Sequence, residues 1–408
     1  MKISFIPLKI VGWMFVIMPG AGLLSVFLAQ RTLLNLSVDK ELLTLYAIYA
    51  ILISVFLYTA PNDGMFAANQ SLQKIPNPSP RRLLLLCTFC FIIVFILMGQ
   101  YTLTHKLERG VVRSSLGLLG FLYNVIVRFF LPALAFLVTF SIFKMKRKRY
   151  YNYFSILLVF MTAFMTGTKS IFIFVFLPAA TLLWPLASFR KKVYLFLVAI
   201  ASILLQSMIF ENREFIEALL YAGARSTVVA AYGITCVWDY LQNYGQVSLL
   251  QHILFSIFGN HVSDILFDAV GINFSGNISK IITMIYYPAY DLAKAGSTNL
   301  TLTLLGELLL FFGYWSYLII ILFGIGIVIV FNKMKKYIVC GQLKYTTMMM
   351  VFITFVLFPV INSSGIFSLI SIPNILYLTA LYIILTYIFL KPIRIDDRIV
   401  PREVQLKQ

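Results

Sequence analysis

Long runs of apolar residues are the feature of this sequence that most constrains its fold. Several runs hold about 20 apolar residues, the length a helix needs to cross the hydrocarbon core of a bilayer. Because lipid offers no hydrogen-bond partner to an open backbone, a chain that crosses it repeatedly does so as helices. Of the 408 residues, 61% are hydrophobic and only 12% are charged, which is more apolar surface than a water-soluble core hides. The sequence therefore predicts an all-α polytopic integral membrane protein.

Hydropathy places about ten transmembrane helices along the chain. The first apolar run begins at Phe5 and is too long for the core of a cleavable signal peptide, so we interpret it as the first span. No internal repeat or low-complexity linker interrupts the pattern, so residues 1–408 are expected to form a single membrane domain. The expected spans cover residues 5–30, 42–61, 83–100, 116–143, 152–167, 170–189, 193–210, 301–332, 346–362 and 366–390.

Basic residues fall in short clusters between the apolar runs. The clusters begin at Lys144, Arg190, Lys333 and Lys391. If the N-terminus is cytoplasmic, all four clusters lie on the cytoplasmic side, which is the placement that the positive-inside rule requires. This pattern accounts for the net charge of +18 and argues against a nucleic-acid partner.

One long segment, residues 211–300, lies between the seventh and eighth expected spans and is placed on the outer face. Its length of about ninety residues exceeds ordinary connections, and loops of that size are usually functional. The stretches "REFIEALLYAGAR" and "VSLLQHILFSIFGNHVSDILFDAV" have helical apolar spacing with charged breaks. This spacing predicts helices that lie at the membrane interface. All three histidines and most carboxylates also fall outside, so we expect an active site to face outward.

Glu307 is the first candidate for chemistry, because it lies near the start of an apolar run that continues to Phe331, in "TLLGELLLFFGYW". In one interpretation it occupies the first turns of the span, where the helix dipole and lipid headgroups stabilise it. In the other it lies in a water-filled cavity open to the outside, because intramembrane ionisable groups usually mark function. There it would act as the general base for a sugar hydroxyl.

Two cations in or beside the expected spans form the second group of candidates. Arg128 stands about twelve residues from either end of its apolar run, so it faces the bundle or a cavity, where it either pairs with an acid or carbonyls or binds an anion. Lys169, in "TGTKSIF", opens a helix after a tight external turn. It either extends to the interface or forms an anion site with the helix N-terminus.

The long external segment adds further candidates. Arg213 and Arg225 open it, and arginine forks match phosphate oxygens in pairs, either of lipid headgroups or of a ligand. His261 and Asp291 are possible acid–base groups. The spacing of His252 and His261 matches no helical-face metal pattern, so no metal site is expected.

This layout resembles the bacterial O-antigen (oligosaccharide repeat-unit) polymerases of the Wzy type. The stretch "STNLTLTLLGELLLFFGYWSYLIIILFGIG" is similar to the family's Gly-Glu, aromatic and Phe-Gly pattern after the large loop. "MTGTKSIFIFVFLP" is similar to its Gly-x-Arg-Ser turn, with Lys169 in place of the arginine. The family's arginine-x10-glycine spacing is not met, because Ala224 and Cys236 stand where glycine would follow Arg213 and Arg225.

The resemblance implies a glycosyltransferase of the bacterial inner (cytoplasmic) membrane, with a GT-C-like helical bundle, an active site facing the periplasm, and neither metal nor cofactor. Its donor and acceptor would be undecaprenyl-diphosphate-linked glycans, and its partners would be membrane lipids, a chain-length regulator and a flippase. Arg128, Lys169, Arg213 and Arg225 would hold the diphosphate leaving group and stabilise its charge. Glu307 would be the general base, with His261 and Asp291 as the alternatives.

Two other functions remain open at this stage. A flippase for lipid-linked oligosaccharide fits Arg128, although transporters typically show inverted repeats and broken helices at the membrane midplane. An O-antigen ligase, or another lipid-dependent glycosyltransferase, shares the layout and differs in its acceptor. Asp39, Lys40 and Glu41 resemble the acidic pair of polyprenyl-phosphate-sugar transferases, but their loop has only about eleven residues, where such enzymes place a long one.

The predicted topology is testable by chemical labelling. In a variant without native cysteines, Ser275→Cys should react with a membrane-impermeant maleimide in intact spheroplasts, because it lies in the outer segment. Lys146→Cys, in a basic cluster, should react only after the membrane is opened. Labelling of position 275 that also requires an opened membrane would overturn the topology.

Overall fold

The computed structural model describes most of the chain as helices. The described residues are 2–29, 36–66, 78–99, 116, 119–144, 149–211, 213–247, 302–363 and 366–390, with the isolated residues 249, 253, 257, 282, 283, 285 and 286. The predicted residues His261 and Asp291 lie outside this described part, as does most of the segment 211–300 beyond residue 247.

Each expected span coincides with helical structure. The first half of the chain contains α1 (Ile6–Leu28), α2 (Lys40–Thr59), α3 (Pro80–Val94), α6 (Leu119–Asn124), α7 (Leu131–Lys144), α8 (Arg149–Met165), α9 (Lys169–Leu183) and α10 (Phe189–Glu211). The second half contains α11 (Phe215–Tyr244), α16 (Thr303–Phe312), α17 (Ser316–Val339), α18 (Leu343–Phe352), α19 (Phe358–Ser363) and α20 (Ile372–Phe389). Short π or 3-10 segments join or follow several of these helices, namely η2 (Phe95–Gly99), η3 (Val125–Phe130), η4 (Gly313–Trp315), η5 (Ile353–Leu357) and η6 (Ile366–Ile370).

The all-α, membrane-type fold is confirmed. Within the described residues, eight helical stretches are long and apolar enough to cross a membrane. The helices at the expected spans 152–167 and 170–189 are also apolar but shorter. The total of about ten spans therefore stays a prediction, as does the side of the membrane on which residues 211–300 lie.

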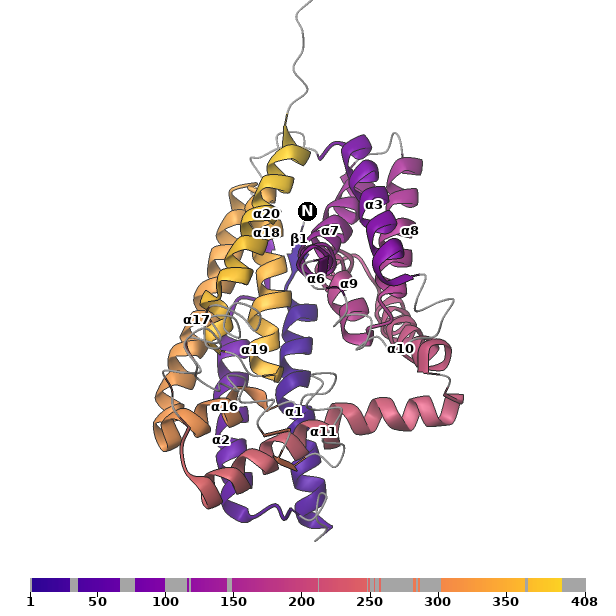
Figure 1. The fold of residues 1–408 in the computed structure, drawn as a ribbon. Coiled ribbons are helices and arrows are strands. Elements are labelled where there is room, and N and C mark those ends of the chain that lie inside the picture. Colours follow the sequence, from indigo (N-terminus) through magenta and orange to yellow (C-terminus); the bar gives the residue numbers. More distant parts are fainter. Residues whose placement is uncertain are drawn as a thin grey trace, which may run out of the picture.

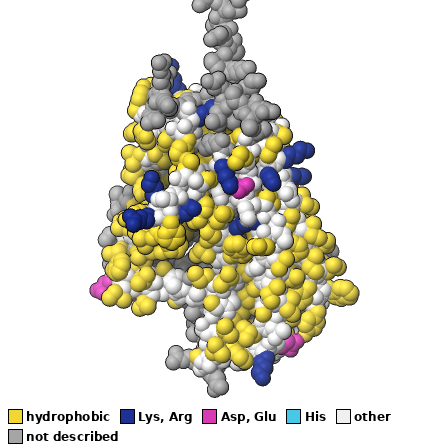
Figure 2. Space-filling view, turned by 180° about the vertical axis from the view of Figure 1, so that it is seen from behind, with side chains coloured by type: hydrophobic (Ala, Val, Ile, Leu, Met, Phe, Trp, Pro, Cys, Tyr) yellow, Lys and Arg dark blue, Asp and Glu magenta, His cyan; other side chains and the backbone are white. Residues whose placement is uncertain are grey.

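The helices form an elongated bundle that α11 crosses at one end (Figure 1). The helix α7 is its central element, buried from Leu131 to Ser141 and packed against α8, α9, α3 and α18. Outward-facing apolar side chains such as Ile51, Leu85, Leu322 and Ile383 are more than half exposed, as expected for a surface solvated by lipid. Figure 2 shows that hydrophobic side chains cover much of one face of the molecule, with Lys and Arg mainly over its upper half.

Basic residues lie near the ends of several helices. Lys144 ends α7, and Lys336 lies in the last turn of α17. Arg82, in the first turn of α3, donates hydrogen bonds to the carbonyls of Tyr387 at 2.7 Å and Leu390 at 2.6 Å, at the end of α20. Cations near C-terminal carbonyls are favoured because those carbonyls carry the negative end of the helix dipole.

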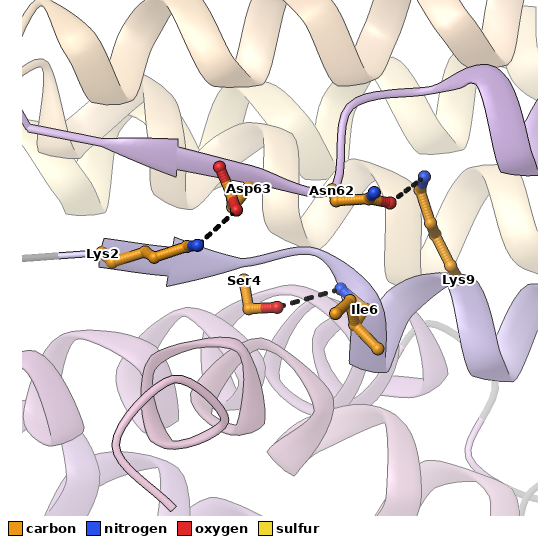
Figure 3. A network of polar contacts seen from close by, with 6 residues as sticks. All are labelled: Lys2, Ser4, Ile6, Lys9, Asn62 and Asp63. Carbon is orange, nitrogen blue, oxygen red and sulfur yellow. Dashed lines mark hydrogen bonds and ion pairs between the residues drawn. The ribbon is translucent and has the colours of Figure 1, made fainter.

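A small two-stranded sheet and a buried lysine connect the start of α1 to the end of α2. The strand β1 (Lys2–Ser4) pairs antiparallel with β2 (Asp63–Met65), and Lys2 forms an ion pair with Asp63 at 2.6 Å (Figure 3). Lys9 is 1% exposed, and its Nζ donates to Asn62 Oδ1 at 2.7 Å and to the carbonyls of Tyr58 and Ala60. The ammonium thus satisfies carbonyls that the last turn of α2 leaves without intrahelical partners.

Replacing Lys9 by methionine should destabilise the protein, because it removes charge-assisted hydrogen bonds and leaves their acceptors buried. The expected cost is about 3 kcal/mol. Lys2→Met removes only an exposed ion pair and should cost less than about 1 kcal/mol. Thermal unfolding of both purified variants in detergent tests this difference. Equal melting temperatures for the two variants would contradict the role assigned to Lys9.

Gly324 allows α17 to pack closely on α2. A Cβ atom at this position would lie 2.0 Å from a carbon of the Phe56 ring, whereas a Cβ atom at Gly326 would meet nothing within 4 Å. Small residues permit such close approach between membrane helices, where packing supplies much of the association energy.

Gly324→Ala should therefore force α2 and α17 apart, at a cost of about 1–3 kcal/mol. Gly326→Ala is the matched control on the same helix and should leave stability unchanged or slightly raised. Resistance to unfolding by denaturant in mixed micelles would measure both. The packing argument fails if the two variants unfold at the same denaturant concentration.

Candidate functional site

The apolar run that contains Glu307 is broken, and this differs from the single span expected over residues 301–332. The helix α16 ends at Phe312, and Gly313 adopts a φ of +52°, a conformation that glycine accepts more readily than other residues. The single 3-10 turn η4 follows, and the 24 residues of α17 exceed the length that a helix needs to cross a bilayer. A hydropathy profile cannot show this break, because the residues around it are apolar or aromatic.

The short helix α16 is enclosed rather than lipid-facing. Its residues from Thr303 to Phe311 are all buried, and it packs against α11, α17 and α19. A helix that is hydrophobic on every side is typically buried in this way. Glu307 therefore lies inside the protein, while its depth in the membrane stays a prediction.

The Glu307 carboxylate is held by backbone. The side chain is fully buried, and Oε2 accepts a hydrogen bond at 3.0 Å from the N–H of Ile366, the first residue of η6. A negative charge is favoured at a helix N-terminus, where the first N–H groups lack intrahelical acceptors. Glu307 thus connects α16 to the chain between α19 and α20.

Arg128 lies in the π segment η3 and is half-buried. It is close enough to the Tyr377 hydroxyl of α20 to interact with it electrostatically. The ring of Phe129 packs against the same tyrosine, with 5.1 Å between centroids. Single π turns within helices are frequent at functional sites, which is consistent with a functional role for Arg128.

Two predicted residues lie at helix N-termini. Lys169 is the first residue of α9 and follows Gly167, whose φ is +59°; the Lys169 side chain is outside the described part of the structure. Arg213 precedes α11, forms an ion pair with Glu217 at 2.8 Å, and lies over the Tyr221 ring at 3.6 Å. A phosphate ligand of Arg213 would compete with both contacts.

Some of these predicted residues belong to elements that contact one another, or to an element that contacts a hydrogen-bond partner of another candidate. The helix α20 contacts both η3, which carries Arg128, and η6, whose first N–H binds Glu307. The helix α9, which begins at Lys169, also contacts η3.

Arg213, by contrast, is far from Glu307 along α11. A Cβ atom at Gly306, the neighbour of Glu307, would lie 3.4 Å from Val237. Val237 is about 33 Å along the helix from Phe215, at 1.5 Å per residue. Arg225 lies in the N-terminal half of α11, and its side chain is not described.

A cavity that the sequence did not reveal lies between the C-terminal part of α11 and the break between α16 and α17. Its volume is about 270 Å³. The N–H of Val247 donates to the carbonyl of Leu310 at 3.1 Å, which fixes the chain after α11 against α16. The cavity is lined by Trp238, Leu241, Gln242, Gly245, Gln246, Leu309, Gly313 and Tyr314.

The two carboxylates at the start of α2 hold the aromatic rings of this cavity. Asp39 caps α2, with Oδ1 accepting from the N–H of Leu42 at 2.7 Å, while Oδ2 accepts from the indole N–H of Trp238 at 2.9 Å. Glu41 accepts a hydrogen bond from the Tyr314 hydroxyl. Both acids stand out in the sequence as an acidic pair, but the sequence does not indicate their hydrogen-bond partners. The aromatic and amide side chains of "WDYLQNYGQ", residues 238–246, were the available signal.

Another polar group lies beside the cavity, where Asp239 Oδ2 accepts from the Tyr286 hydroxyl at 2.6 Å and from Asn243 Nδ2 at 3.0 Å. Burial, together with the hydrogen bond to Asp239, raises the pKa of Tyr286, so its phenol remains a donor at neutral pH. Among the described residues, no group of three or more His, Cys, Asp or Glu side chains is arranged to hold a metal ion.

Comparisons of the chain with protein-family models, with curated proteins and with solved structures found no match.

Proposed function

We propose that this protein is a glycosyltransferase that polymerises undecaprenyl-diphosphate-linked oligosaccharide repeat units into O-antigen or a related surface polysaccharide. The reaction would take place at the periplasmic face of the bacterial inner membrane, which in this proposal is the end of the bundle crossed by α11. The observation that carries the proposal is the fully buried Glu307 carboxylate on a short interrupted helix, because a buried charge in a membrane protein usually serves function.

The proposed step is a displacement at the anomeric carbon of the donor. Glu307 takes the proton of an acceptor hydroxyl, the hydroxyl oxygen bonds to the anomeric carbon of the growing glycan, and undecaprenyl diphosphate leaves with the bonding electron pair. The chain moves to the new lipid-linked repeat. The N–H of Ile366 orients the base, and withdrawal from water strengthens its interactions with the substrate.

The leaving group requires cations that balance its charge. Arg128 and Lys169 are the leading candidates, because η3, which carries Arg128, contacts both α9 and α20, and α20 also contacts η6 beside Glu307. Arg213 and Arg225 lie on or before α11, the helix that crosses the end of the bundle, and would contact the diphosphate of the second lipid-linked glycan (Figure 1). His261 and Asp291 remain alternative general bases.

Glu307→Gln should abolish polymerisation while keeping the fold. Glutamine retains an oxygen that accepts from Ile366 N–H, but it cannot take a proton at neutral pH. In a host that lacks the native gene, the variant should be expressed and inserted normally, yet convert long glycan to single repeats on a polysaccharide gel. The expected loss is at least about 100-fold in polymer, typical of a missing general base.

Arg213→Ala, with Arg213→Lys as its charge-conserving control, tests the cation that lies far from Glu307. The alanine variant should also shorten the glycan, and lysine should restore part of its length. Unchanged chain length in both Glu307→Gln and Arg213→Ala would remove these residues from the mechanism.

Deletion of the gene distinguishes a polymerase from a ligase. Loss of a ligase leaves long polymer on its lipid carrier, whereas loss of a polymerase leaves single repeats on the acceptor.

A further inference from the structure

The cavity between α11, α16 and α17 has a lining of the kind that recognises carbohydrate. Trp238 and Tyr314 supply aromatic rings, while Gln242 and Gln246 supply amides. An aromatic ring packs on the apolar C–H face of a sugar, and an amide offers a donor pair and an acceptor to neighbouring hydroxyls. Among the described residues, no charged side chain lines the cavity. A neutral, polar and partly apolar ligand therefore fits better than a phosphate.

The two rings are fixed before any ligand arrives. The indole N–H of Trp238 is bound to Asp39 and the hydroxyl of Tyr314 to Glu41, and both acids lie at the start of α2. Their polar atoms are thus already paired, so the rings present mainly carbon to the cavity. Ordering these side chains in advance reduces the entropy that a ligand loses on binding.

Gly313 shapes the other wall. A Cβ atom at this position would lie 2.9 Å from Nε2 of Gln246, so the absence of a side chain lets that amide approach the helix break. The positive φ of Gly313 also produces the turn that brings Tyr314 to the cavity. Gly313 therefore positions both the amide of Gln246 and the ring of Tyr314.

Size and position restrict what the cavity holds. Its volume of about 270 Å³ lies just below the usual range of pockets for drug-sized ligands, roughly 300–1,000 Å³, and suits a single sugar ring. Leu309 lines the cavity, whereas Glu307, two residues earlier, points to Ile366. Two residues rotate a helix by about 200°, so Glu307 lies on the other side of α16 from the cavity.

We propose that this cavity is a glycan subsite that holds one sugar residue of a lipid-linked oligosaccharide while another residue of the same glycan reaches the far side of α16. The identity of the glycan rests on the proposed function, but its binding is measured independently of catalysis. In this arrangement Asp39 and Glu41 are positioning residues, because they contact the rings rather than the sugar.

Trp238 is a built-in reporter of the cavity. The chain has four tryptophans. A protein carrying Trp13→Phe, Trp184→Phe and Trp315→Phe retains Trp238 alone. The probe is the repeat-unit oligosaccharide released by mild acid from the host's lipid-linked pool. Titrating it into the purified full chain in detergent should change the tryptophan emission saturably.

Tyr314→Ala, made in the single-tryptophan protein, should weaken binding about tenfold, the loss expected for one aromatic anchor. Tyr244→Ala is its matched control, because Tyr244 is an exposed tyrosine near the end of α11 that does not line the cavity. Gln242→Ala is a second test with little effect on packing, because Gln242 is exposed, and it should weaken binding severalfold. Tyr314→Phe retains the ring and should retain most of the affinity.

Each outcome decides the proposal. No saturable emission change in the folded single-tryptophan protein would overturn the subsite, as would equal affinities for Tyr314→Ala, Gln242→Ala and Tyr244→Ala. If Glu307→Gln still polymerises but Tyr314→Ala and Gln242→Ala lose oligosaccharide binding, the polymerase mechanism fails and the glycan subsite stands. If polymerisation depends on Glu307 but the oligosaccharide does not bind at Trp238, the glycan subsite fails and the polymerase mechanism stands.

Discussion

The structure depends on one constraint: the lipid interior offers no hydrogen-bond partner to the backbone. Long apolar helices satisfy their backbone groups through their own hydrogen bonds. Where a helix ends or changes pitch, the backbone groups left without intrahelical partners must be covered by other parts of the protein. The break at Gly313 is covered by α11, whose following residue Val247 donates to the carbonyl of Leu310. The end of α2 is covered by the Lys9 ammonium. These contacts at the helix ends, more than the spans themselves, give the bundle its particular shape.

The same constraint explains why Glu307 is informative. A buried carboxylate is costly unless it receives hydrogen bonds, and here a backbone N–H at the start of a 3-10 segment supplies one. That contact ties α16 to η6 and hence to α20, which also contacts η3, the segment that carries Arg128. Structural and chemical roles therefore coincide at one side chain, and a glutamine substitution is suited to separating them because it preserves the shape and removes the charge.

Much of the fold was predictable from the sequence, because an apolar run of twenty residues has few alternatives in a membrane. The interruption after Phe312 was not, since Gly313, Tyr314 and Trp315 are also common within spans and at their ends. The partner of Arg213 was readable, because Glu217 lies only four residues further along the chain, in the first turn of α11, and such pairs are local. The partners of Asp39 and Glu41 were not, because Trp238 and Tyr314 follow them by 199 and 273 residues, and hydropathy carries no information on such pairings.

The buried position of Lys9 also bears on how the chain is made. Its acceptors, Tyr58, Ala60 and Asn62, are synthesised about fifty residues after it, once α2 is complete. Until then the ammonium, which lies in the first turn of α1, lacks these acceptors and would extend toward the membrane interface, as lysines near helix ends do. Burial of Lys9 therefore requires both N-terminal helices to be complete and packed together.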